Sequence, residues 1–172
     1  MNLGQKFLET LHAVRRKENL PNAEADNGYV IEAEIDGMRV AAEIQDFDKF
    51  SCILKTLAVR RTQAPPANTV LKKFLQRQAA ECERRIAYLL ENFRLVEVDE
   101  ENYLAQVRSA TPHQKHDEKF YYEVLLQHGL GATFARYRMA LEAESRERVA
   151  CHLTHEVLER LVDDLAAALQ VN

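Results

Sequence analysis

Arginines recur near the end of the chain, where they alternate with apolar residues. A hairpin over residues 134–153 with a three-residue connection at residues 143–145 would place Tyr137 and Cys151 on one face. The other face would then carry the basic side chains Arg136, Arg138, Arg146, Arg148 and His152. Guanidinium groups bind carboxylate and phosphate oxygens in pairs of hydrogen bonds, so this pattern predicts a cationic binding face. The alternative is an ordinary solvent face neutralised by nearby acids such as Glu123.

A polar loop predicted at residues 109–118 contains side chains that can bind metal ions. His113, His116 and Asp117 could supply imidazole and carboxylate ligands to zinc or another divalent ion. The alternative is a plain polar loop, because this histidine spacing fixes no ligand geometry in a loop and Lys115 would repel a cation. A small-ligand or metal-dependent enzyme is therefore one alternative for the function.

Other signals of catalysis are weak. The sequence contains no GxSxG elbow and no glycine-rich phosphate loop followed by lysine. Cys52, Cys82 and Cys151 are widely spaced, and each lies in an apolar periodic segment, so we expect buried small apolar side chains. These observations favour a non-enzymatic protein without a cofactor.

Composition limits the class of protein. The chain has 172 residues, 47% of them hydrophobic and 29% charged, which is typical of one globular domain over residues 1–172. The net charge of −4 makes nucleic-acid binding unlikely unless the basic hairpin face forms a local patch. No apolar stretch approaches the roughly 18 residues of a membrane span, and the first residues lack a signal-peptide core, so we expect a cytoplasmic protein without membrane contact.

Hydrophobic periodicity predicts the elements that position these side chains. Helical spacing predicts helices at residues 7–14, 71–93 and 157–169, the last capped by Thr154. Alternation predicts strands at residues 31–35, 38–44, 50–59, 95–98, 103–108, 119–127, 133–142 and 146–152. The order α-βββ-α-βββββ-α predicts an α+β fold, in which helices cover antiparallel sheet built from two β-meanders. Whether the meanders form one sheet or two stays open at this point.

The hairpin at residues 31–44 has a defined register. A two-residue Asp36-Gly37 turn would place Ile35 opposite Met38 and put every apolar side chain on one face. On the other face, Glu34 would lie opposite Arg39.

The segment order resembles a known family. Residues 7–21, the acidic hairpin at 29–44, the strand at 50–59, the helix from about residue 68 and the closing helix at 154–169 are similar in order and pattern to the small acidic chaperones of bacterial type III secretion. This resemblance implies a homodimer that binds unfolded protein segments along apolar grooves of its sheet and helices. It covers about half of the chain, and the five-strand second meander departs from the family pattern.

The sequence therefore predicts a non-enzymatic, chaperone-like binding protein, with a protein partner and a homodimer expected. A partner segment would contact an apolar groove and the cationic sheet face. The alternatives are the enzyme that uses His113 and His116 and a nucleic-acid-binding protein that uses the basic hairpin.

Overall fold

A computed structural model describes residues 1–16, 28–89, 91–109 and 113–171, so Pro21 and most of the first connector lie outside the described residues. The helices of the described residues are α1 (Leu3–Arg16), α2 (Leu71–Arg85) and α3 (His155–Leu169). The strands are β1 (Tyr29–Ile35), β2 (Met38–Phe47), β3 (Ser51–Arg61), β4 (Phe93–Asp99), β5 (Leu104–Ser109), β6 (His113–Lys115), β7 (Glu118–Gln127), β8 (Gly131–Ala140), β9 (Glu147–Val149) and β10 (Cys151–Thr154). The α+β class is confirmed.

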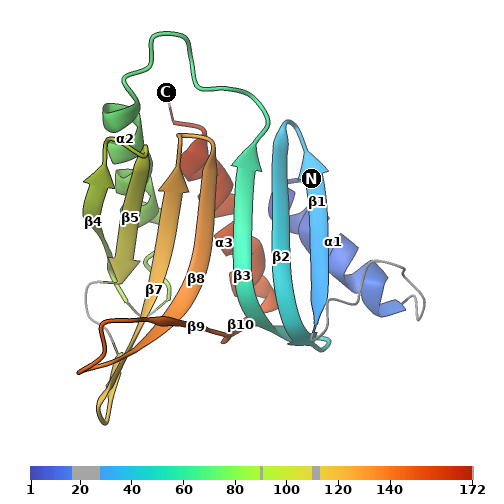
Figure 1. The fold of residues 1–172 in the computed structure, drawn as a ribbon. Helices are drawn as coiled ribbons and strands as arrows, with labels where there is room; N and C mark the ends of the chain where they lie inside the picture. The colour runs from blue at the N-terminus through green and yellow to red at the C-terminus, as the bar shows by residue number, and fades with distance from the viewer. Residues whose placement is uncertain (17–27, 90, 110–112, 172) are drawn as a thin grey trace.

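The strands form one antiparallel sheet in the order β1-β2-β3-β8-β7-β5-β4, with β6, β9 and β10 attached to β7, β8 and β3. The helices lie behind this sheet in Figure 1. The two meanders are therefore joined, and the join is the pairing of β3 with β8, in which Leu57 lies opposite Phe134. No helix in the described residues is long and apolar enough to span a membrane.

β1 and β2 form the hairpin that the alternation predicted. Ile35 lies opposite Met38, and the same register continues without interruption to Tyr29. The two turn residues, Asp36 and Gly37, have φ values of 50° and 74°. Positive φ at both central positions is the geometry that a two-residue hairpin turn requires, so the local sequence selects this register.

The predicted helix over residues 71–93 is too long. α2 ends at Arg85, and Phe93 instead begins β4, where it lies opposite Ser109 of β5. Phe93 and Leu89 are nevertheless buried. The apolar spacing therefore predicted which side chains enter the core, but pairing with β5 determined that the backbone leaves the helix.

The predicted hairpin over residues 134–153 has a different register and a longer connection, residues 141–146. Tyr137 of β8 lies opposite Arg148 of β9. The chain then leaves β8, and His152 of β10 lies opposite Ile53 of β3. β9 and β10 run across the lower ends of β8 and β3 in Figure 1. The strand predicted over residues 146–152 is therefore divided into β9, which pairs with β8, and β10, which pairs with β3. Both partners are accessible because β3 and β8 pair with each other only over part of their lengths.

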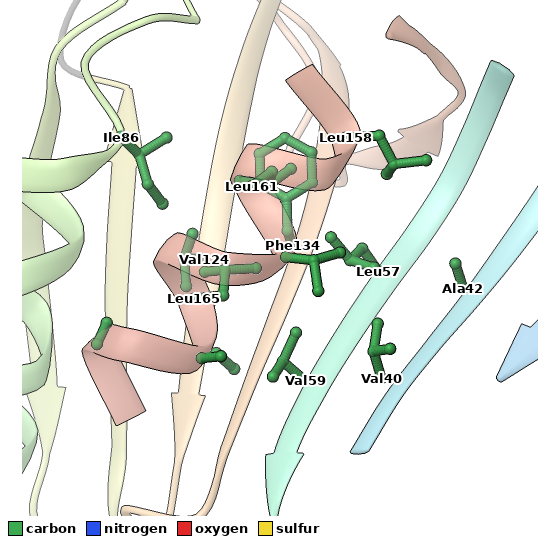
Figure 2. Packing of buried hydrophobic residues seen from close by; sticks show 14 of the residues in the cluster. Val40, Ala42, Leu57, Val59, Ile86, Val124, Phe134, Leu158, Leu161 and Leu165 are labelled. Carbon is green, nitrogen blue, oxygen red and sulfur yellow. The ribbon is translucent and has the colours of Figure 1, made fainter. Parts of the chain in front are cut away.

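The predicted closing helix is confirmed, including its cap. The Thr154 hydroxyl accepts a hydrogen bond from the Val157 N–H at 3.2 Å, which satisfies one backbone donor of the first turn. Its apolar side chains pack on the middle of the sheet. Figure 2 shows Leu158, Leu161 and Leu165 beside Leu57, Val124 and Phe134. This packing places α3 behind β3, β7 and β8, and in the part of the chain that the structure describes no helix covers the opposite face of the sheet.

Candidate protein-binding surface

The sheet face opposite the helices, called the open face below, has a row of small or apolar side chains at its centre. Ala41, Ala58, Thr133 and Leu125 lie opposite one another in turn across β2, β3, β8 and β7. Each of these side chains is half-buried. Because side chains alternate along a strand, they point away from the neighbouring core residues that face the helices. The row is therefore a weakly polar surface that is partly exposed to solvent.

A buried carboxylate lies on the open face beside this row. Glu123 of β7 has 1% of its side chain exposed, and its Oε2 is 2.6 Å from Arg108 Nε and 2.6 Å from Arg146 Nη1. Arg146 Nη2 also donates to Oε1 at 3.0 Å. Burial of an unpaired carboxylate is costly, so the two guanidinium groups account for its position. The hydrogen bond to Glu123 in turn raises the pKa of Arg146 above its ordinary value.

Two stacked tyrosines extend this cluster. Tyr121 and Tyr137 lie opposite each other on β7 and β8, with ring centroids 5.8 Å apart. The Arg146 guanidinium lies 3.9 Å from the Tyr137 centroid, and Arg146 Nη1 donates to the Tyr121 hydroxyl at 3.2 Å. Arg146 is thus held by a carboxylate, a hydroxyl and an aromatic face, which anchors the end of the β8–β9 connection on the sheet.

Arg148 and Lys119 add two further cations to the same region. Arg148 lies opposite Tyr137, and Lys119 lies two residues before Tyr121 on the same face of β7. Arg148 is exposed and Lys119 is partly exposed. We call this region the basic end of the open face; it consists of Arg108, Lys119, Arg146, Arg148, Tyr121 and Tyr137. Arg108 and Arg146 bind the buried carboxylate of Glu123, and Lys119 and Arg148 add two further positive charges, so these side chains together carry a net positive charge.

The predicted grouping of all five basic side chains on one face is wrong. Arg138 lies on the helix side of β8, where it pairs with Glu147 and, at 3.7 Å, with Glu118. Arg136 lies on the same side, 5.2 Å from the centroid of Phe120. The observed register differs from the predicted one by an odd number of residues, which moves Arg148 to the face opposite Arg136 and Arg138.

His152 is also separate from the arginine cluster. It lies on β10, where its Nε2 is 3.0 Å from the Ser51 hydroxyl of β3. The structure therefore brings together two of the five predicted binding residues, Arg146 and Arg148, on the open face. Whether these side chains bind a partner stays a prediction.

The histidine loop differs from the predicted polar loop. Residues 113–115 form β6 and pair with β7, while residues 110–112 lie outside the described residues. His113 is exposed on β6, and His116, with a φ of 53°, and Asp117 form the turn into β7. Within the described ranges, no group of three His, Cys, Asp or Glu side chains is placed to hold a metal ion.

The three cysteines are free and buried, as predicted. Burial raises the pKa of Cys52 and Cys82 to about 12 and that of Cys151 to about 11. Each thiol is therefore protonated at neutral pH, and a protonated thiol is a poor nucleophile.

Arg108 was not among the binding residues predicted from the sequence, and Glu123 was predicted only as a neutralising acid. The available signal was an isolated carboxylate among the apolar residues of β7. Such a side chain must either reach solvent or find a cationic partner, but the sequence does not indicate which cation reaches it.

Comparison with protein-family models, curated proteins and solved structures finds no match to this chain. The function proposed next therefore depends on the geometry of the open face.

Proposed function

We propose that this chain is a non-enzymatic, chaperone-like binding protein that holds an acidic segment of another protein on its open face. The observation that carries the proposal is the basic end, where Arg148 and the anchored Arg146 lie beside two stacked tyrosines. Carboxylates of the partner would bind Arg148 and Lys119. Its apolar side chains would lie on the adjacent row that includes Leu125.

The charge at the other end of the open face favours a short acidic segment over a nucleic acid. Glu32 and Glu34 of β1 lie on the open face, together with Glu43 of β2. Arg39 lies 3.9 Å from Glu32 and 3.8 Å from Glu34, so it offsets only part of this negative charge. A long polyanion that crossed the sheet would be repelled there, whereas a segment confined to the basic end would not.

The open face also replaces the apolar groove expected from the resemblance to type III secretion chaperones. The apolar side of the sheet is covered by the helices, with Leu158, Leu161 and Leu165 of α3 fully buried against it. The proposal therefore uses the uncovered side. A homodimer and a cytoplasmic location remain predictions, as does the resemblance itself.

The test compares cations on opposite sides of the sheet. The double variant Arg148→Ala, Lys119→Ala removes the exposed cations of the basic end, and Arg138→Ala is the matched control on the helix side. Each chain is immobilised and exposed to extract of its native host at moderate salt, and captured proteins are quantified by mass spectrometry. Because a hydrogen bond to a charged group contributes about 1.5–3 kcal/mol, we expect the double variant to weaken capture by about tenfold or more.

The control should capture the same protein as the unchanged chain. Equal capture by the double variant would contradict the proposal, provided that thermal unfolding shows both variants folded. Capture that disappears after nuclease treatment would favour the nucleic-acid alternative. A stoichiometric metal ion in untagged protein would favour the enzyme alternative through His113 and His116.

A further inference from the structure

Two histidines from opposite ends of the chain meet where α1 contacts the start of α3. His12 Nε2 lies 3.1 Å from His155 Nδ1, and the ring centroids are 5.0 Å apart. His155 is 8% exposed, and its other ring nitrogen, Nε2, is buried without a hydrogen-bond partner. A hydrogen bond at this distance needs one nitrogen to donate and the other to accept, so the two facing nitrogens share one proton.

The surroundings of His155 oppose a second proton. Burial is the largest cause that lowers the pKa of His155 below its ordinary value, and His12 and Arg15 of α1 act in the same direction. A hydrogen bond with the Ser51 backbone at the start of β3, and after it the Asp48 carboxylate in the β2–β3 turn, act in the opposite direction and raise this pKa. The Asp48 carboxylate also accepts the backbone N–H groups of Phe50 and Ser51. His152 of β10 contacts the Ser51 hydroxyl and belongs to a separate hydrogen bond.

The histidine contact is one of two polar contacts that join α1 to α3 in the described residues. The other is a hydrogen bond of 2.8 Å from the Gly4 N–H to Asp163 Oδ1, near the start of α1. Between these contacts α1 is held by apolar side chains, with Phe7 and Leu11 fully buried. The histidine pair is therefore the polar attachment of the C-terminal half of α1.

We propose that the His12–His155 pair is a proton-sensitive contact that controls the docking of α1. With one shared proton, the pair holds α1 against α3. When both rings are charged, the facing nitrogens both carry protons and repel each other, and the C-terminal half of α1 opens. Opening exposes Leu11 and the sheet surface beneath it, which gives the chain an apolar surface that neutral pH keeps covered.

The direction of the pH dependence follows from the lowered pKa of His155. An accessible histidine has a pKa of about 6.5. In the docked form the pKa of His155 is lower than this ordinary value. Below about pH 6.5 the opened form therefore binds more protons than the docked form. The stabilisation of the docked helix is complete above this range and is lost as the pH falls through it.

Hydrogen exchange of the full chain tests the proposal. Exchange of α1 amides is measured at pH 7.5 and pH 5.0 and corrected for the intrinsic effect of pH. We expect α1 to open about tenfold more often at pH 5.0, because the opened form binds a proton that the docked form disfavours. In His155→Gln and His155→Phe the ratio should fall below about threefold. The matched control His152→Gln should keep the full change, because His152 lies outside the pair.

Two results would overturn the proposal: equal opening of the unchanged chain at both pH values, or a full pH response in both His155 variants. If the variants do not fold, the unchanged chain still decides the question through NMR titration of its histidine rings. Protonation of the His155 ring that coincides with faster exchange of α1 amides supports the pair. Protonation of this ring with no change in α1 contradicts it.

Discussion

The open face contains the same ion pair, arginine with glutamate, in two very different settings. At the β1–β2 end, Arg39 Nε is 3.8 Å from Glu34 Oε2, and both side chains are more than half exposed. At the basic end, Glu123 is 1% exposed and is bound at 2.6 Å by Arg108 and by Arg146. The first pair follows from the hairpin register, whereas the second joins β5, β7 and the β8–β9 connection.

The difference shows that environment, not residue type, determines how much an ion pair matters to folding. Water screens the exposed pair, and ordering two long side chains costs entropy, so such pairs contribute about 0–1 kcal/mol. Glu123 is shielded from solvent, so its charge depends on the two guanidinium groups that bind it. The ion pairs of Glu123 should therefore be sensitive to single substitutions that the Arg39–Glu34 pair tolerates.

The largest effect is expected from removal of the buried carboxylate. Glu123→Ala leaves Arg108 and Arg146 facing each other without a counter-charge, so we expect the free energy of unfolding to fall by about 3–5 kcal/mol. Urea denaturation measures this change. Glu34→Ala, which removes the carboxylate of the exposed pair, is the matched control and should cost less than about 1 kcal/mol. Equal losses of unfolding free energy in the two variants would show that burial does not determine how much each ion pair contributes to stability.

An intermediate effect is expected from removal of one arginine. Arg146→Met keeps an unbranched side chain but removes the guanidinium that lies over Tyr137, and Arg108 still neutralises Glu123. We expect a loss of about 1–3 kcal/mol, the range for hydrogen bonds to charged groups. Hydrogen exchange should also increase in β9, because Arg146 anchors the connection before it. Unchanged exchange in β9 would mean that strand pairing alone holds this segment.

The smallest effects are expected in the β1–β2 hairpin, where the backbone should matter more than the ion pair. Gly37→Ala places a side chain at a φ of 74°, and its Cβ would lie 3.2 Å from the Thr62 hydroxyl. We expect a loss of about 1 kcal/mol from the strained turn. Arg39→Ala should cost only a few tenths of a kcal/mol. Thermal unfolding of the two variants ranks these losses. A larger loss in Arg39→Ala than in Gly37→Ala would mean that the ion pair stabilises the hairpin more than the turn does.

Local sequence determined those features whose physical causes lie within a few residues. The Asp36-Gly37 turn selects the hairpin register because both residues accept positive φ. Thr154 caps α3 because its hydroxyl reaches an N–H three residues later. The apolar periodicity around the three cysteines predicted their burial. At Phe93 the same periodicity predicted burial correctly but did not identify the strand conformation of the backbone.

Only the tertiary structure decided the arrangement of the candidate site. The register of β9 depends on where β3 and β8 stop pairing, and this contact joins residues more than 70 positions apart, such as Leu57 and Phe134. That register places Arg148 on the open face and Arg138 behind the sheet. The Glu123 cluster likewise needs three segments in contact. The alternating pattern indicates that successive side chains of one strand lie on opposite faces of the sheet. Pairing with distant strands determines which side chains of different strands share a face.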